Sequence, residues 1–158
     1  MSEYKQRGDG WVLAQLALFA AIGLAPGRIA GLPDWPSSLR RPGRLVGLLL
    51  GSAGLLLMSA ATNALGPSFT IFPRPRDDGA FIQQGVYSVV RHPIYAGTLL
   101  VALGWSLLRG STPALALTAV LGVALDQKAR REEAWLARRF AEYGDYRRRV
   151  RKLIPWVY

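Results

Sequence analysis

Four apolar segments run through the 158-residue chain, and each is free of Lys, Arg, Asp and Glu. Between them lie stretches rich in charge, proline and glycine, which are typical of loops and helix ends. The first two segments meet or approach the length of about 18 apolar residues that is typical of a membrane-crossing helix. The pattern predicts four membrane helices, over 11–24, 45–65, 94–108 and 113–125.

The last two segments are short and are separated only by residues 109–113. Gly110 and Pro113 indicate a tight turn, so we expect these helices to form an antiparallel hairpin. Because a helix of 15 residues spans only about 22 Å, the fourth helix is expected to continue beyond the membrane. Its apolar face continues, and no helix breaker precedes Gly144; the face is formed by Leu125, Ala129, Leu136 and Phe140.

The loops are marked by proline. The first is expected to run to Pro42, and within 66–91 three prolines exclude an uninterrupted helix, although a short re-entrant helix there remains the alternative. Small residues at Gly47, Gly51 and Gly54 favour close approach of the second helix to a neighbour. The expected fold class is therefore all-α: a polytopic membrane helix bundle of about four transmembrane helices, with a helical hairpin and a cytoplasmic C-terminal extension.

The basic residues suggest an orientation. The chain has 20 Lys and Arg against 10 Asp and Glu, and ten of the basic residues lie within 126–158. Four crossings put both termini on one side, and the positive-inside rule places them in the cytoplasm, in a multi-pass protein of the cytoplasmic (inner) membrane. The outer loops would then hold five arginines, more than the rule prefers: Arg28, Arg40, Arg41, Arg44 and Arg109.

Composition also excludes several classes of function. The chain has no cysteine, which excludes disulfides, thiolate zinc sites and cysteine nucleophiles. A single histidine argues against a His-based metal cluster, and no nucleic-acid-binding module is visible despite the net charge of +10. A cleaved signal peptide is the alternative for residues 1–30, but Glu3 and Asp9 interrupt the basic leader, which favours a retained anchor.

The first candidate for chemistry is Arg91-His92-Pro93, which directly precedes the third helix. Proline suits the first turn of a helix, so His92 is expected at its cap. The free N–H groups of such a helix start attract anions, and Arg91 adds to this effect. Gly97, one turn later, would let a ligand approach the backbone. The alternative is a basic cap that anchors the helix to lipid phosphates.

The second candidate is the pair Glu132-Glu133 on the extended fourth helix. Neighbouring helical residues point about 100° apart, so the apolar face is expected to turn Glu132 inward. An inward carboxylate needs a cation, and Lys128 lies four residues earlier. The alternative is an ordinary charged surface helix.

A hairpin would bring both candidates to the same cytoplasmic end. Donors for an anion and carboxylates for a cation would together suit a zwitterion such as S-adenosylmethionine. Aromatic faces for the cation could come from four tyrosines, which could equally form an interfacial belt: Tyr87, Tyr95, Tyr143 and Tyr146.

These residues are similar to the motifs of the isoprenylcysteine carboxyl methyltransferase and phospholipid methyltransferase superfamily. The resemblance covers about residues 63–158 and rests on an ordered set: Gly85-x-Tyr87, Arg91-His92-Pro93-x-Tyr95-x-Gly97, Lys128, Glu132-Glu133, Phe140, Tyr143, Tyr146 and Ile154-Pro155. It implies an integral membrane enzyme in which 66–158 form the methyltransferase core of a single domain, with N-terminal helices over 1–65. The residues implied to enclose S-adenosylmethionine are Tyr87, Arg91, His92, Tyr95, Gly97, Glu132 and Glu133.

The resulting hypothesis is a methyltransferase that acts on a lipophilic or amphiphilic acceptor at the membrane interface. Its acceptor could be a carboxylate, an amine or a thiol, and no catalytic residue or metal is assigned. Membrane lipids are the expected surroundings. One alternative is a phospholipid N-methyltransferase, and another is a non-catalytic membrane module whose basic tail docks on anionic lipid.

Overall fold

The computed structural model describes residues 9–27, 35–70, 72 and 79–158 and contains, over these residues, helices and no β-strand. The all-α prediction is therefore confirmed. The elements are α2 (Asp9–Leu24), α3 (Ser37–Leu65), η1 (Gly66–Ser68), η2 (Gly85–Ser88), α4 (Pro93–Arg109), α5 (Thr112–Arg139) and α6 (Tyr143–Arg149).

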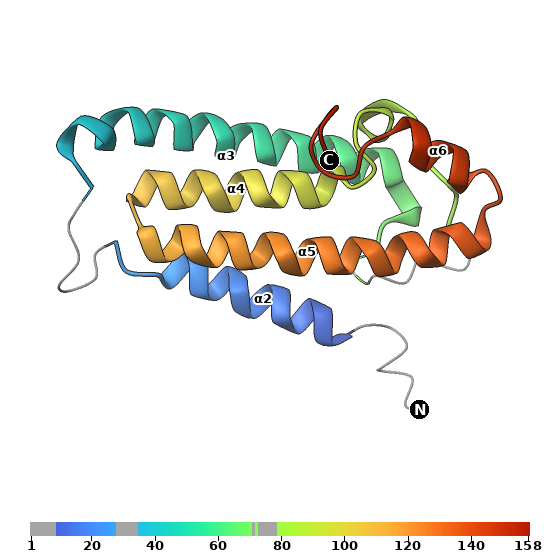
Figure 1. The fold of residues 1–158 in the computed structure, drawn as a ribbon, viewed down its shortest axis with the longest axis horizontal. Helices are drawn as coiled ribbons and strands as arrows, with labels where there is room; N and C mark the ends of the chain where they lie inside the picture. The colour runs from blue at the N-terminus through green and yellow to red at the C-terminus, as the bar shows by residue number, and fades with distance from the viewer. Residues whose placement is uncertain (1–8, 28–34, 71, 73–78) are drawn as a thin grey trace.

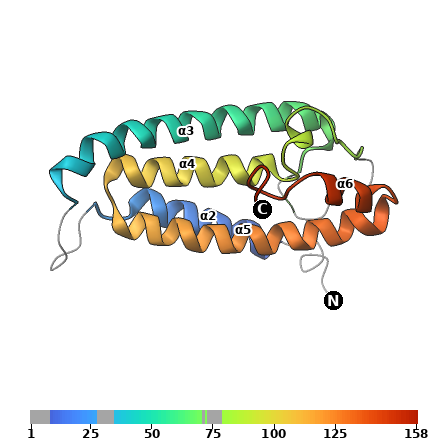
Figure 2. The ribbon, with the colours of Figure 1, turned by 45° about the horizontal axis from the view of Figure 1, so that its top comes forward.

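The long helices form an elongated bundle (Figure 1). Helices α3, α4 and α5 lie side by side in alternating directions, and α2 packs along the first half of α5. The turned view in Figure 2 shows α3, α4 and α5 in the same order, with α6 and the last residues folded back beside the start of α4. One end of the bundle therefore gathers the starts of α2 and α4, the end of α5 and α6.

Helix α3 begins eight residues earlier than the expected start at residue 45, which corrects the expected loop. Pro36 lies at the N-cap with φ −53° and ψ 141°, and Pro42 lies inside the helix. A proline one and a half turns into a helix removes a single backbone hydrogen bond, a cost that this helix tolerates. The other three apolar segments form helices within two residues of the expected starts.

The fourth helix does extend past its apolar half, but it ends at Arg139 and does not reach Gly144. Phe140 is extended, with φ −118° and ψ 114°, and its ring stacks on Phe81 at a centroid distance of 5.0 Å. The aromatic contact with a distant segment thus accompanies the end of α5, whereas Gly144 lies within α6.

The turn between α4 and α5 confirms the predicted hairpin. Gly110 has the left-handed conformation, with φ 58° and ψ 37°, that ends a helix at low cost when the residue is glycine. Ser111 then caps α5 by accepting a hydrogen bond from the Ala114 N–H at 3.2 Å. Its hydroxyl also donates to the Pro26 carbonyl at 2.7 Å, which ties the end of α2 to the turn.

Between residues 66 and 91, the described part of the chain forms only the two 3₁₀ turns η1 and η2 and irregular structure. No re-entrant helix occurs among these described residues; 71 and 73–78 lie outside them.

Glycines hold α3 and α4 at close range. A Cβ on Gly47 would lie 2.6 Å from the Gly104 carbonyl oxygen, and one on Gly54 would lie 2.6 Å from that of Gly97. One on Gly104 would lie 2.5 Å from the Gly47 carbonyl oxygen and 2.7 Å from the Gly51 nitrogen. The predicted close approach of small residues is therefore found, and it lets the two backbones pack directly.

This contact provides a matched pair of substitutions on facing helices. Gly104→Ala should destabilise the protein by roughly 1–3 kcal/mol, because the added methyl forces two backbones apart. Gly51→Ala should be neutral or slightly stabilising, because a Cβ there meets nothing within 4 Å. Thermal unfolding in detergent measures both. Equal melting temperatures for the two variants would contradict this packing.

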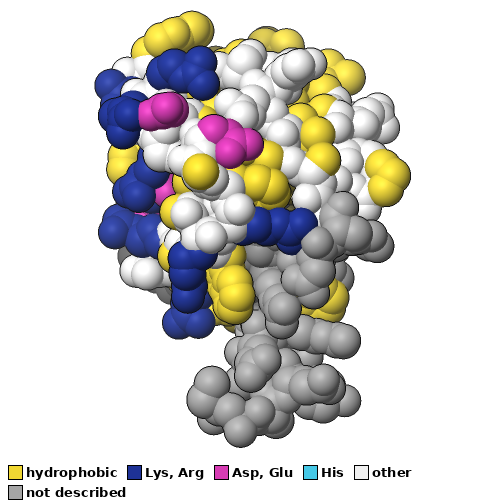
Figure 3. Space-filling model, turned by 90° about the vertical axis from the view of Figure 1, so that its right-hand side faces the viewer, with side chains coloured by type: hydrophobic (Ala, Val, Ile, Leu, Met, Phe, Trp, Pro, Cys, Tyr) yellow, Lys and Arg dark blue, Asp and Glu magenta, His cyan; other side chains and the backbone are white. Residues whose placement is uncertain are grey.

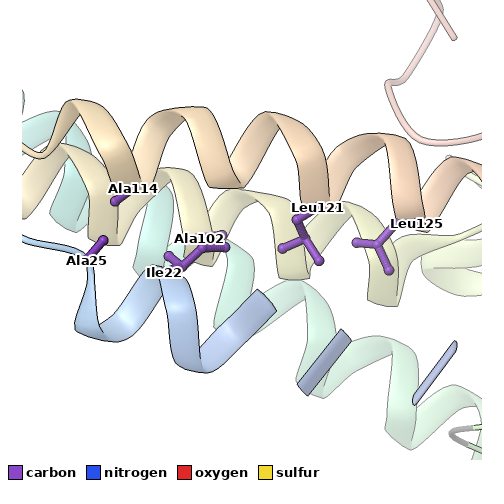
Figure 4. Close-up of a cluster of buried hydrophobic side chains, with 6 residues drawn as sticks. All are labelled: Ile22, Ala25, Ala102, Ala114, Leu121 and Leu125. Atoms are coloured by element: carbon purple, nitrogen blue, oxygen red, sulfur yellow. The ribbon is translucent and has the colours of Figure 1, made fainter. Parts of the chain in front are cut away.

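The buried core is small, and the outer surface is apolar. Six residues from α2, α4, α5 and the segment after α2 form the core in Figure 4: Ile22, Ala25, Ala102, Ala114, Leu121 and Leu125. On α3, by contrast, Leu45, Leu49 and Leu56 are each more than 60% exposed. Among the described residues, one stretch, Ser37–Ser68, is long and apolar enough to cross a membrane; α2 and α4 are shorter apolar helices. Such an exposed apolar surface is atypical of a water-soluble monomer.

Candidate active site

The start of α4 is held by the C-terminal segment. The Arg91 N–H donates to the Arg151 carbonyl at 2.8 Å, and the His92 N–H donates to the Lys152 carbonyl at 3.0 Å. Pro93 is the first residue of α4, and His92 caps it with φ −125° and ψ 63°. The predicted cap position of His92 is confirmed, and pairing with a segment 60 residues away fixes where its ring lies.

A buried ion-pair network joins α4 to α5. Arg91 contacts the Glu133 carboxylate through Nε and Nη2, both at 2.9 Å, and His92 Nε2 lies 3.1 Å from the same Oε1 atom. The side chains of Arg91, His92 and Glu133 are at most 8% exposed. Arg91 Nη1 also donates to the carbonyls of Arg147 and Val150, so the guanidinium links α5 to α6 and its C-terminal end. We call Arg91, His92 and Glu133 the buried triad.

Glu132 belongs to a second, more open group. Its Oε2 atom accepts a hydrogen bond from the Tyr95 hydroxyl at 2.8 Å and lies 3.7 Å from His92 Nδ1. The Tyr95 and His92 rings stack in parallel, with centroids 5.2 Å apart. The Glu132 side chain is 28% exposed, so its carboxylate remains accessible to a ligand.

Glu132 thus faces the interior, as the helical pattern suggests, but it is not the more deeply buried of the two glutamates. Glu133 is the more deeply buried, at 4% exposure, and it pairs with Arg91 and His92 of the Arg-His-Pro motif. The deep burial of Glu133 was not predicted, because α6 and the C-terminal segment cover a second face of α5, which the apolar pattern of α5 alone cannot show. The cationic and acidic motifs also contact each other directly, so they do not simply face a ligand from two sides.

Lys128 is buried between Gln15 of α2 and the Tyr95 ring. Its ammonium donates to Gln15 Oε1 on α2 at 2.9 Å and lies 5.3 Å from the centre of the Tyr95 ring. Burial lowers the pKa of Lys128, and the nearby charge of Glu132 opposes this shift. Glu132 is thus an electrostatic partner of Lys128, as expected, while its hydrogen bond comes from Tyr95.

These groups line a cavity of about 340 Å³. This volume lies within the range of roughly 300–1,000 Å³ that is usual for small-molecule sites. All four tyrosines named from the sequence line it, together with Arg91, His92, Lys128 and Glu132, while α2 adds apolar walls. Gly97 and Glu133 are not among the lining residues.

One hydroxyl in this wall is unsatisfied. Tyr143 is 1% exposed, and its hydroxyl has no hydrogen-bond partner among the described residues. Burial and the charge of Glu133 raise the pKa of Tyr143, so the hydroxyl stays protonated. Because a buried hydroxyl without a partner is costly, this group is well placed to bond to a ligand.

Gly97 serves helix packing. A Cβ there would lie 2.6 Å from Met58 Cγ and 2.7 Å from the Gly54 carbonyl oxygen, both on α3. The expectation that this glycine opens the backbone to a ligand is therefore not supported by its position. We leave Gly97 out of the site proposed below.

A polar network secures the C-terminal segment beside the cavity. Lys152 Nζ lies 2.7 Å from Asp126 Oδ1, and the Tyr158 hydroxyl donates to the same oxygen at 2.8 Å. Arg130 Nε donates to the other carboxylate oxygen at 2.7 Å. The neighbouring face of α5 and α6 is strongly basic, and Figure 3 shows Lys and Arg side chains gathered along one side of this end.

The buried carboxylates are expected to make the stability of the fold depend on pH in the acid range. Burial alone would raise the pKa of Glu133, but hydrogen bonds from His92 and Arg91 outweigh it and lower the pKa to about 2. A lowered folded-state pKa stabilises the protein above the unfolded value near 4.5, and this contribution is lost as the pH falls toward 2. For Glu133 it amounts to roughly 3 kcal/mol.

We therefore expect the melting temperature in detergent to fall steeply between pH 4.5 and pH 2. Asp126 acts in the same direction: burial raises its pKa, but hydrogen bonds from Lys152, Arg130 and Tyr158 hold it at about 2. Glu133→Gln should flatten part of this acid slope. An unchanged slope in that variant would contradict the assignment.

Some members of the site were not predicted from the sequence. Gln15 is the only polar side chain within 11–22, and an isolated amide in an apolar helix is itself a sign of an interior contact. Phe81 stacks on Phe140 and contacts Tyr143, but nothing in its local sequence indicates this. The backbone pairing of 151–152 with 91–92 likewise has no local sequence signal.

The fold and these residues agree with the comparisons with known proteins. The sequence profile of the phospholipid methyltransferase family matches residues 43–143, which include the buried triad, Tyr95 and Glu132. The chain therefore belongs to the phospholipid methyltransferase family. Family membership and the exposed apolar surface of α3 indicate a helical membrane protein.

Two relatives and one solved structure illustrate the similarity. A protein-S-isoprenylcysteine O-methyltransferase of Schizosaccharomyces pombe is 33% identical over 108 residues, 66% of this chain and 46% of the relative. The cobalt-zinc-cadmium resistance protein CzcN of Cupriavidus metallidurans is 35% identical over 121 residues, 73% of this chain and 54% of the relative.

The solved structure is that of a eukaryotic intramembrane Ras methyltransferase, isoprenylcysteine carboxyl methyltransferase. It superposes with a TM-score of 0.67 at 24% identity, over 72% of this chain and 42% of that one. This likeness shows a shared fold. The chain spans about half the length of the curated relatives described here.

Proposed function

We propose that the protein is an integral membrane methyltransferase that uses S-adenosylmethionine and acts on an amphiphilic acceptor at the membrane interface. The observation that carries this proposal is the cavity at the end of the α4–α5 hairpin, where Glu132, Lys128 and four tyrosines converge within the family-matched region. The buried triad beside it fixes the α4 start against α5.

The residues fit a zwitterionic cofactor. When bound, S-adenosylmethionine would supply a methyl group on a positively charged sulfur. Transfer of the methyl group to the acceptor breaks the carbon–sulfur bond and leaves a neutral thioether. Glu132 is the accessible carboxylate for a cationic group, with the Tyr87 and Tyr95 rings beside it. Lys128, the protonated Tyr143 hydroxyl and the N–H groups of the first turn of α4 can bind a carboxylate.

The buried triad is proposed to act through position. Because Glu133 engages both Arg91 and His92, the charge of Arg91 is largely neutralised before any ligand binds. Their contribution is to hold the His92–Tyr95 stack and Glu132 in place. Orientation of this kind is the main requirement of a methyl transfer, which needs neither a metal nor an acid. Correct orientation can lower the activation barrier by roughly 7–11 kcal/mol.

The acceptor is proposed to enter from the lipid side. Val12, Leu16 and Phe19 of α2 line the cavity, and Leu16 is also 56% exposed on the outer surface. An apolar wall between the bilayer and the reacting groups suits an acceptor with a lipophilic part.

We further propose that α2, α3, α4 and residues 112–125 of α5 cross the membrane four times, with both termini cytoplasmic in the inner membrane. The alternating directions of the helices support this arrangement, as do the exposed leucines of α3. The charged second half of α5 then lies outside the bilayer.

The name of the matching family favours a second candidate, a phospholipid N-methyltransferase. In that case the acceptor is the amine of a lipid headgroup. The non-catalytic alternative, a module that docks on lipid through its basic tail, predicts salt-dependent vesicle binding without methyl transfer.

A labelling experiment tests the proposal and separates the candidates. Purified protein is incubated with methyl-labelled S-adenosylmethionine and membrane extract, and the labelled fraction is then treated with mild base. Release as volatile methanol indicates a carboxyl methyl ester, whereas label that stays non-volatile on the phospholipid headgroup indicates N-methylation. If no fraction gains label above a heat-inactivated control, the proposed activity is wrong.

A further inference from the structure

We propose that the end of the bundle opposite the candidate active site binds the phosphate group of an anionic phospholipid. A second cavity, of about 200 Å³, lies there and is lined by three arginines from two helices: Arg40 and Arg44 of α3 and Arg109 of α4. The full length of α4, 17 residues or about 25 Å, separates this cavity from His92.

The wall of this cavity is ordered by side-chain contacts. Arg40 Nε donates to the Trp35 carbonyl at 3.0 Å, and Trp35 Nε1 donates to Thr112 Oγ1 at 3.0 Å. Trp35 therefore links the start of α3 to the start of α5. The Arg109 guanidinium lies 5.6 Å from the centre of the Trp105 ring on its own helix. These contacts pre-position two guanidinium groups beside one hollow.

Charge identifies the class of ligand. Residues 25–44 contain four arginines and a single acidic residue, Asp34, and Arg109 adds a further positive charge from α4. None of the described residues that line the cavity is acidic. Guanidinium groups match the geometry of phosphate oxygens, and basic hollows between membrane helices bind anionic lipid headgroups.

The surroundings favour a lipid over free phosphate. Directly after Arg44, α3 exposes Leu45, Leu48 and Leu49, which are 66%, 57% and 69% exposed. A phospholipid whose phosphate lies among the arginines would lay its acyl chains along these leucines. Trp105 is 40% exposed beside Arg109, and tryptophan is common at the level of headgroups. The ligand also accounts for three of the five arginines that the positive-inside rule leaves unexplained: Arg40, Arg44 and Arg109.

The test compares lipids and matched variants. The 158-residue protein in a zwitterionic detergent is titrated with phosphatidylglycerol or phosphatidylcholine, and bound lipid is counted by native mass spectrometry. We expect selective binding of phosphatidylglycerol. The double substitution Arg44→Gln/Arg109→Gln should weaken phosphatidylglycerol binding on the order of thirtyfold, because each arginine near an anionic headgroup raises the affinity roughly fivefold.

The control is Arg138→Gln/Arg149→Gln, which removes the same charge from exposed positions outside both cavities. It should bind phosphatidylglycerol like the parent, and Arg44→Lys/Arg109→Lys should recover part of the affinity. Equal losses in the two glutamine variants, or equal binding of both lipids, would overturn the proposal. Competition by inorganic phosphate at the lipid concentration would assign the cavity to free phosphate and would also overturn it.

Discussion

Replacing Glu133 by glutamine is expected to destabilise the protein by roughly 3–5 kcal/mol, the usual cost of removing one partner from a buried ion pair. The substitution keeps the shape of the side chain but leaves Arg91, which is 8% exposed, without its counter-charge. In thermal unfolding at pH 7 this corresponds to a decrease of the melting temperature on the order of 10 °C.

Arg147→Gln is the matched control for that experiment. Arg147 Nε lies 3.7 Å from the same carboxylate, but its side chain is 62% exposed, so the pair should contribute less than about 1 kcal/mol. The double substitution Arg91→Met/Glu133→Leu removes both charges and should recover much of the stability. A full-size loss in Arg147→Gln, with none in Glu133→Gln, would reverse our assignment of the buried pair.

Replacing Glu132 by glutamine is expected to destabilise the protein much less than Glu133→Gln does and to weaken S-adenosylmethionine binding about 10- to 100-fold. Glu132 is partly exposed and lines the cavity, so its carboxylate is accessible to a cationic ligand. A hydrogen bond to a charged group contributes about 1.5–3 kcal/mol, which corresponds to that range.

Glu142→Gln makes the same chemical change at an exposed position that does not line the cavity. Its affinity for the cofactor should equal that of the parent protein. If Glu132→Gln and Glu142→Gln bind with equal affinity, Glu132 is not a cofactor ligand. Measuring unfolding for each variant separates a loss of affinity from a loss of folded protein.

Much of the fold could be predicted because it depends on local patterns. Runs of apolar residues indicate the helices, and Gly110 with Pro113 indicates the hairpin turn. The hairpin in turn predicts that Arg91-His92 and Glu132-Glu133 meet, and the structure places His92 and Glu133 within 3.1 Å. The sequence alone therefore suffices to predict that these two motifs lie close together.

The arrangement of side chains inside the site could not be predicted from the sequence, because it depends on segments that are distant along the chain. Which glutamate is buried is decided by α6 and by the pairing of residues 151–152 with 91–92, and neither alters the pattern of α5. Gly97 shows a related difficulty. A glycine near a ligand and a glycine against another helix look alike in sequence, and only the contact with Gly54 and Met58 distinguishes them.

The most direct measurement is a calorimetric titration of the purified protein in detergent with S-adenosylmethionine and with its demethylated product. Our account predicts one saturable binding event per chain for S-adenosylmethionine, markedly weaker in Glu132→Gln and unchanged in Glu142→Gln. A folded protein that gives no saturable heat with either compound would contradict the claim that the cavity beside the buried triad is a cofactor site.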